Sequence, residues 1–414
     1  MRPNKRDASI AQAHIPGWDA LFGLKKQKTM KYIAIIFLLA LSFFAQAQNR
    51  VLKGRIVDTG HQSGIAYTNI GIEGTYFGTA SDADGFFELK IPDEFSGKML
   101  YVSAVGYENR SFPVEELLNK EFARIPLGEQ TYSIEGIDVA AQSRVLFRVI
   151  RTAAERVPEN YQAGPFGLKF HYLGKTLVND SADQIREAIV ELTDQNGYRN
   201  PSVKDAFDSR NYRFVEVNKN FKSYSFPDGN TGFDELLDQD IARSGNTIFN
   251  EELINDYDLH LDGVSAYEGD SVWVVSYKST QPDLAHSGDF YASRIEGKLF
   301  ILKSNYALVR SECVVDANKN SPQNRALATE STEQQNVRYH LTTLYQKQGG
   351  KYVVSYMDMD KTFINPAGDK ITLSRKAALL DLDPGARMLD GRSYFEDSAY
   401  NEQFWNAFHS GKKL

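Results

Sequence analysis

The apolar positions of this chain fall into three patterns, and the first is a continuous run near the N-terminus. Residues 32–44 are almost entirely apolar, four lysines at 25–31 precede them, and Ala-Gln-Ala follows at 45–47. A basic cluster, an apolar core and a small-x-small end are typical of a secretory signal peptide. The core has about a dozen residues, whereas a membrane-spanning helix needs about 20. We therefore predict that residues 1–47 are a leader and signal peptide and that translation starts at Met30. No cysteine follows the cleavage site, so we expect no N-terminal lipid.

The second pattern is a series of short β-type runs in residues 48–128. The runs at 52–57, 66–73, 86–91 and 100–105 are separated by segments that contain glycine, serine, proline and aspartate. Several short strands with turn residues between them, and no helical periodicity, indicate a β-sandwich. We predict such a sandwich over residues 48–128, followed by a linker at 129–144.

The third pattern combines one amphipathic helix with many strands in residues 145–414. Helical spacing places five apolar side chains on one face, and Pro158 ends the predicted helix. The five are Leu146, Val149, Ile150, Ala153 and Val157. A short helix is expected at 233–241 within the otherwise polar stretch 196–256. Strand patterns occur at 166–172, 184–192, 272–277, 298–302, 307–315, 338–346, 352–359 and 370–374. The fold class predicted is mainly β: a β-sandwich, then an α+β domain with an antiparallel, curled, half-barrel-like sheet whose concave face holds the helix.

Net charge and cysteine content exclude several classes of function. The chain carries −7, and residues 1–47 hold seven basic and two acidic residues, which leaves −12 for the remainder. Such an acidic protein lacks the basic surface that nucleic-acid binding requires. Cys313, the single cysteine, cannot form an intramolecular disulfide, and its alternating surroundings predict a small buried side chain.

No familiar catalytic or metal-binding spacing is present. The histidines after residue 47 are scattered at 61, 171, 260, 286, 340 and 409, so none forms the paired ligands of a metalloprotease. Asp82 and Asp84 precede Gly85 as in a calcium loop, but the first and twelfth ligand positions would be alanine and isoleucine, so we predict a tight turn. Gly174-Lys175-Thr176 lacks the earlier glycine of a phosphate-binding loop. We expect neither a cofactor nor a metal.

Two further pairs of side chains were candidates for a site. Asp358 and Asp360 lie two apart on a predicted strand and so share a face; we interpret them as solvated carboxylates rather than an acid–base pair. Trp273 and Tyr277 lie four apart on a predicted strand and could form a ligand surface, although packing in the sheet core is the explanation we favour.

Four ordered blocks in the first half resemble a known family. They are GRIVD at 54–58, IAYTNI at 65–70, GTASDADGFF at 78–87 and VSAVGY at 102–107. Together they resemble the carboxypeptidase regulatory-like domain, a transthyretin-like sandwich of exported bacterial proteins and of the N-terminal part of many TonB-dependent outer-membrane receptors. The family's domain has no active site, so the resemblance implies a scaffold or docking module.

The second half resembles uncharacterised envelope proteins that also carry this sandwich. The similarity lies in AERVPENY at 154–161, GDSVWVVSY at 269–277 and GKLFI at 297–301. The strand pattern is also similar to the half-barrel of periplasmic lipoprotein carriers.

The first hypothesis for function is therefore a non-catalytic binding or scaffold protein, periplasmic or associated with the outer membrane. Its expected partner is an envelope protein such as an outer-membrane receptor or assembly component, with no membrane span after signal cleavage and no lipid anchor. The alternatives are a periplasmic carrier of an apolar ligand in the half-barrel, and an envelope hydrolase with a carboxylate site.

Overall fold

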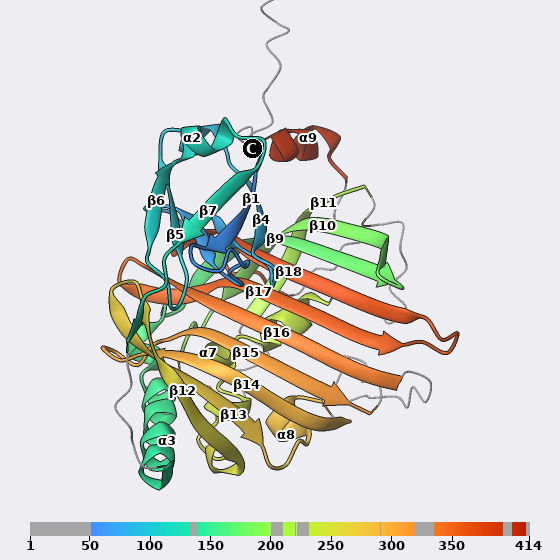
Figure 1. The fold of residues 1–414 in the computed structure, drawn as a ribbon. Helices are drawn as coiled ribbons and strands as arrows, with labels where there is room; N and C mark the ends of the chain where they lie inside the picture. Colours follow the sequence, from blue (N-terminus) through green and yellow to red (C-terminus); the bar gives the residue numbers. More distant parts are fainter. Residues whose placement is uncertain are drawn as a thin grey trace, which may run out of the picture. The chain divides into compact units, whose positions relative to one another are not determined.

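Strands dominate the computed structural model of this protein (Figure 1). The structure describes residues 51–132, 139–199, 210–219, 221, 232–289, 291–318, 335–391 and 400–410. The predicted leader and signal peptide lie outside these residues. The predicted fold class is confirmed: a sandwich comes first, and a large curled antiparallel sheet with helices follows.

The sandwich has one sheet of three strands and one of four. The three-stranded sheet has the order β4-β1-β7, from β4 (Phe86–Lys90), β1 (Val51–Asp58) and β7 (Ala123–Leu127). The four-stranded sheet has the order β3-β2-β5-β6, from β3 (Gly78–Ala80), β2 (Asn69–Ile72), β5 (Met99–Ser103) and β6 (Arg110–Pro113). The two short helical segments are η1 (Asp93–Phe95) and α2 (Val114–Leu118). Apolar side chains from both sheets form one core.

Three of the four strands predicted for the sandwich are confirmed, and the fourth is shorter than expected. The run at 66–73 forms a strand only from Asn69, because Tyr67 adopts a left-handed φ of 52° that interrupts extended backbone. The strands β3, β6 and β7 were not predicted. Each has only three to five residues, too few for alternation to stand out.

The large sheet has eleven strands in the order β11-β10-β9-β18-β17-β16-β15-β14-β13-β12-β8, and its described neighbours are all antiparallel (Figure 1). The strands are β8 (Thr131–Tyr132), β9 (Phe166–Val178), β10 (Ser181–Asp194), β11 (Arg210–Val217), β12 (Tyr257–Tyr267), β13 (Asp270–Ser279), β14 (Ala292–Leu302), β15 (Leu308–Ala317), β16 (Gln335–Gln348), β17 (Lys351–Ile364) and β18 (Lys370–Asp383). All eight predicted strands of this region are present, most of them longer than expected. β11 and β12 were not predicted.

Helices cover the concave face of this sheet. They are α3 (Val139–Glu155), α4 (Val157–Asn160), α6 (Phe233–Asp238), α7 (Ile241–Ser244), η2 (Thr247–Phe249), η3 (Ile254–Asp256) and α8 (Leu284–Ser287), while α9 (Glu402–Ser410) packs near β4. The predicted apolar face of α3 is confirmed, since its side chains are buried in the same core as the sheet. Pro158 lies in α4 rather than at the end of α3, and the expected linker 129–144 contains β8 and the first residues of α3. No helix among the described residues is long and apolar enough to cross a membrane.

A buried ionic network fastens the helical layer to the edge of the large sheet. Asp194 of β10 accepts hydrogen bonds from Arg210 Nε at 2.9 Å and Arg243 Nε at 2.6 Å. Asp240, the N-cap of α7, accepts from Arg210 Nη2 at 2.7 Å and from the Tyr198 hydroxyl at 2.8 Å. Burial raises the pKa of Asp194, but the two guanidinium groups outweigh this effect and lower it to about 2. The carboxylate is therefore ionised at neutral pH and depends on its partners.

Replacing Asp194 by alanine should lower the free energy of unfolding by about 3–5 kcal/mol, because two buried guanidinium groups then lose a counter-charge. Urea unfolding followed by circular dichroism measures the change. Glu191→Ala is the matched control, because Glu191 pairs with the half-exposed Arg213 and its loss should cost less than about 1 kcal/mol. Equal effects of the two substitutions would contradict the assigned role of the network.

Candidate binding sites

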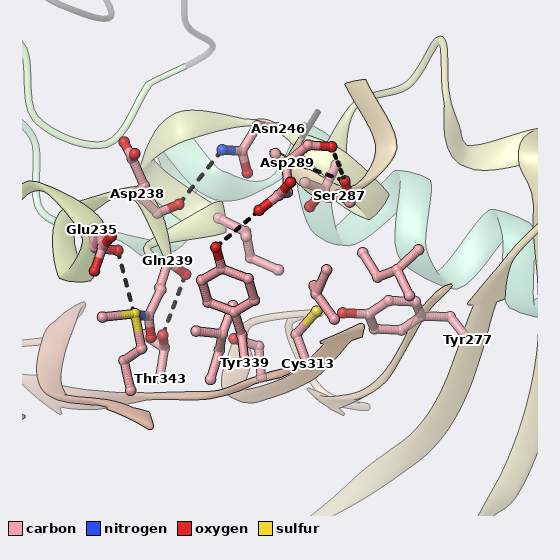
Figure 2. A pocket seen from close by; sticks show the side chains of 18 residues that line it. Glu235, Asp238, Gln239, Asn246, Tyr277, Ser287, Asp289, Cys313, Tyr339 and Thr343 are labelled. Atoms are coloured by element: carbon pink, nitrogen blue, oxygen red, sulfur yellow. Dashed lines mark hydrogen bonds between the residues drawn. The ribbon is translucent and has the colours of Figure 1, made fainter. Parts of the chain in front are cut away.

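A small cavity remains between the helices and the concave face of the sheet (Figure 2). It has a volume of about 100 Å³ and lies between α6, α7 and the loop after α8 on one side and β13–β17 on the other. The Tyr339 hydroxyl donates to Asp289 Oδ2 at 2.9 Å, and Thr343 Oγ1 donates to the carbonyl of Gln239 at 3.2 Å. The side-chain oxygens of Gln239 and Asn246 are buried and have no hydrogen-bond partner among the described residues.

Beside this cavity, aromatic side chains of the described residues pack between the helices and the concave face. Tyr161 stacks on Tyr198 with ring centroids 5.0 Å apart, and Phe233 packs against Tyr212 at 5.0 Å. These four rings belong to one continuous core that also contains the apolar face of α3. Sites for drug-sized ligands have about 300–1,000 Å³. The remaining cavity is therefore large enough for a few water molecules or a very small ligand, and too small for an acyl chain.

The two aromatic residues proposed as a ligand surface lie in different surroundings. Tyr277 lines the cavity, and its hydroxyl donates to the Glu312 carbonyl at 3.3 Å. Trp273 does not line it; its ring packs 5.3 Å from Tyr306, with Lys303 Nζ 5.5 Å above it. The structure therefore does not join the two side chains in one surface.

Cys313 also lines the cavity, beside Tyr277 (Figure 2). Burial raises the pKa of its thiol to about 11. The thiol is thus protonated at neutral pH, which agrees with a packing role rather than a nucleophilic one.

A larger groove lies on the opposite face of the sheet, where the sandwich packs. It has a volume of about 610 Å³ and runs between β3 and β4 of the sandwich and β9, β10 and β18 of the large sheet. Among the described residues, five large apolar side chains are clearly exposed, and three of them line this groove: Phe86 at 44%, Phe122 at 50% and Ile185 at 44%. The rings of Phe86 and Phe122 are 6.3 Å apart. The groove thus concentrates exposed apolar surface at one place.

One carboxylate that lines the groove, Glu187 of β10, has four hydrogen-bond partners. Its Oε1 accepts from Lys90 Nζ of the sandwich at 2.6 Å and from His171 Nε2 at 2.8 Å. Its Oε2 accepts from Asn218 Nδ2 at 3.0 Å and from His409 Nε2 of α9 at 2.8 Å. Burial raises the pKa of Glu187, but the hydrogen bond from His171 and the charge of Lys90 outweigh it and hold the pKa well below its ordinary value. We call Glu187 with these four partners the Glu187 junction.

The interpretation of Asp358 as a solvated carboxylate was wrong. Asp358 lies on the face of β17 that the sandwich covers, and only 6% of it is exposed, whereas Asp360 is exposed. Burial raises the pKa of Asp358 to about 6, against the opposing effect of Lys376, whose Nζ lies 3.3 Å away. Asp358 is buried because the sandwich packs on this strand, and the alternation of residues within the strand could not reveal that contact.

Two loops of the sandwich hold the acidic residues that could suggest a metal site. Asp82 accepts hydrogen bonds from the backbone N–H groups of Asp84 and Phe86 at 3.0 and 2.9 Å, which is the geometry of the predicted tight turn. Asp58, His61 and Glu129 bring their ligand atoms within 4.8 Å of one another. However, Asp58 Oδ1 already accepts the N–H groups of Gly60 and His61, so this group shapes a loop.

Comparison with known proteins agrees with the sandwich. Residues 52–139 match the family described as CarboxypepD_reg-like domain, which confirms the resemblance in this part of the chain. A TonB-dependent receptor P3 from Formosa agariphila is 28% identical over 90 residues, which are 22% of this chain and 9% of the receptor. The chain therefore contains a CarboxypepD_reg-like domain and spans a small part of the length of this relative.

Two solved structures align with a larger part of the chain. They are a LolA superfamily protein from Nitrosomonas europaea and an outer membrane lipoprotein-sorting protein domain from Vibrio parahaemolyticus. Each is 12% identical and covers 58% of this chain and 94% of its own, with TM-scores of 0.23 and 0.26. Scores this low do not establish a common fold.

The Glu187 junction should make part of the stability depend on pH. A carboxyl whose pKa is depressed in the folded state contributes stability above its ordinary pKa, here 4.5, and loses that contribution as the pH falls below it. The native chain should therefore be more stable than Glu187→Gln at pH 7, and the difference should shrink steadily below about pH 4.5. Urea unfolding at a series of pH values measures it. A difference that does not change with pH would contradict the assignment.

Proposed function

We propose that this protein is an exported, non-catalytic binding protein of the bacterial cell envelope that docks a partner protein in the groove beside the sandwich. One observation carries the proposal: three of the five exposed large apolar side chains of the described chain line this groove. Contiguous exposed apolar surface on a folded protein marks an interaction site more often than isolated apolar side chains do.

Burial of these apolar side chains would contribute enough free energy for recognition of a partner. Burying a large apolar side chain that was exposed contributes about 1.5–3 kcal/mol. Phe86 and Phe122 are each about half exposed, and Ile185 adds a third anchor on the other wall of the groove. A few such anchors at the centre of an interface provide most of the affinity in typical complexes.

The partner we propose is an outer-membrane receptor or a component of its assembly. The CarboxypepD_reg-like match and the similarity to part of a TonB-dependent receptor support an envelope location for this domain. Export itself rests on the predicted signal peptide at residues 1–47.

The two alternative functions have less support in the geometry. A carrier of an apolar ligand needs an open concave face, and the cavity that the described residues line on that face has only about 100 Å³. A hydrolase needs ionisable groups that converge in one cleft. Asp358, the carboxylate whose pKa rises to about 6, is covered by the sandwich and pairs with Lys376.

A double substitution in the groove tests the proposal. The chain from Gln48, immobilised on a resin and incubated with a native envelope extract, should retain an outer-membrane protein that mass spectrometry identifies. Phe86→Asp with Phe122→Asp should abolish retention, because charged side chains then replace both exposed rings.

Val145→Asp is the matched control, because Val145 is 49% exposed on α3 and does not line the groove. Circular dichroism should show that both variants are folded. Retention of the same protein by the double variant would refute the groove as the docking site.

A further inference from the structure

The chemistry of the groove indicates what kind of partner segment it binds. Its sandwich wall is formed by β4 over its whole length, from Phe86 to Lys90. In the three-stranded sheet, β4 lies at an edge, since its hydrogen-bonded neighbour is β1 on one side and no described strand pairs with the other. The groove therefore exposes a strand edge as well as apolar side chains.

The register of β4 shows which backbone groups this edge offers. Ile56 N–H donates to the Gly85 carbonyl at 2.8 Å across the β1–β4 pair. In antiparallel pairs, hydrogen-bonded and non-hydrogen-bonded residues alternate. Phe87 therefore bonds to β1, whereas Glu88 and Lys90 direct their N–H and C=O groups away from it. No backbone hydrogen bond of Glu88 or Lys90 occurs in the described structure.

An unpaired edge is a template for an added strand, because main-chain hydrogen bonds supply affinity and alternate side chains supply specificity. An added strand would lie about 4.8 Å from β4. It would lie in the groove of about 610 Å³ opposite Glu88 and Lys90, because Asp82 already bonds the outward N–H and C=O of Phe86. Phe86 and Ile185 line the same groove. Apolar side chains at every second position of such a strand could bury these two residues.

The charges of the groove favour acidic residues at the other positions. Its acidic side chains already have partners: Glu187 is surrounded by four donors, Glu88 pairs with Lys53 at 3.3 Å, and Asp82 bonds backbone N–H groups. Lys175, on the large-sheet wall, is exposed and makes no ion pair in the described part of the chain. A carboxylate on the guest strand would supply its missing counter-charge.

We propose that the groove binds an extended segment of a partner protein, alternately apolar and acidic, which adds to β4 as a further strand. This inference rests on the proposed function, because it names the part of the partner that the groove holds. Strand addition requires the outward N–H of Glu88, whereas the proposed function requires only the apolar residues that line the groove.

The test uses a fluorescein-labelled peptide of sequence EVEVEVE and the chain from Gln48, with binding followed by fluorescence anisotropy. Glu88→Pro should weaken binding about tenfold, because proline removes one outward donor and leaves the pairing with β1 intact; tenfold corresponds to about 1.4 kcal/mol. A peptide methylated at alternate backbone nitrogens should bind as weakly. The basic peptide KVKVKVK should bind more weakly than EVEVEVE, and Lys175→Glu should reverse this order.

Two variants serve as controls. Glu88→Thr removes the charge and keeps the N–H, so it should bind EVEVEVE as the native chain does. Ser111→Pro places proline at an outward N–H of β6, an edge strand outside the groove. Val114 N–H bonds the Lys98 carbonyl across the β5–β6 pair, and Ser111 lies three positions before Val114, so its N–H points away from β5. It should have no effect.

The outcomes separate this inference from the proposed function. Equal peptide binding by Glu88→Pro and Glu88→Thr overturns strand addition. A second result also overturns strand addition: Glu88→Pro retains the envelope partner, whereas the Phe86→Asp, Phe122→Asp variant loses it. That result would leave groove docking intact. A dimer in analytical ultracentrifugation that Glu88→Pro dissociates would assign the edge to a second copy of this chain instead and overturn the proposal. Weaker binding by Glu88→Pro alone supports it.

Discussion

The position of the sandwich on the large sheet depends on the Glu187 junction. A carboxylate that is almost fully buried would be costly to ionise alone. Here, four donors from β4, β9, α9 and the residue after β11 converge on it, so removing any one of these segments leaves a buried charge short of partners. At the other end, Ala80 of β3 packs with Leu344, Tyr356 and Ala378. The groove is the space between these ionic and apolar contacts.

This arrangement assigns different roles to the two faces of the large sheet. The concave face is closed by helices, an aromatic core and the network around Asp194, and it retains a cavity of about 100 Å³. The opposite face carries the sandwich and keeps a groove about six times larger, with exposed rings and an open strand edge. Packing of helices on one face therefore leaves the opposite face for the docking surface that we propose.

Alternation and helical spacing predicted the fold class and most of the long strands, because the order of apolar and polar residues within one element reflects which of its side chains are buried. The same alternation contained a signal for the groove: Phe87 is buried, so Phe86, its neighbour in a strand, must point outward. The groove itself was not predictable. Lys90, Glu187 and His409 are far apart in sequence and join only when the sheets pack. For the same reason, Asp358 was misinterpreted as solvated, and the separate surroundings of Trp273 and Tyr277 did not show in their spacing.

The most direct test of groove docking is site-specific photo-crosslinking in intact cells. A benzoylphenylalanine at position 86 projects into the groove, whereas one at position 145 lies on α3, away from it. Groove docking predicts one discrete adduct with an envelope protein from position 86 and none from position 145. The same adducts from both positions, or an adduct only from position 145, would contradict it.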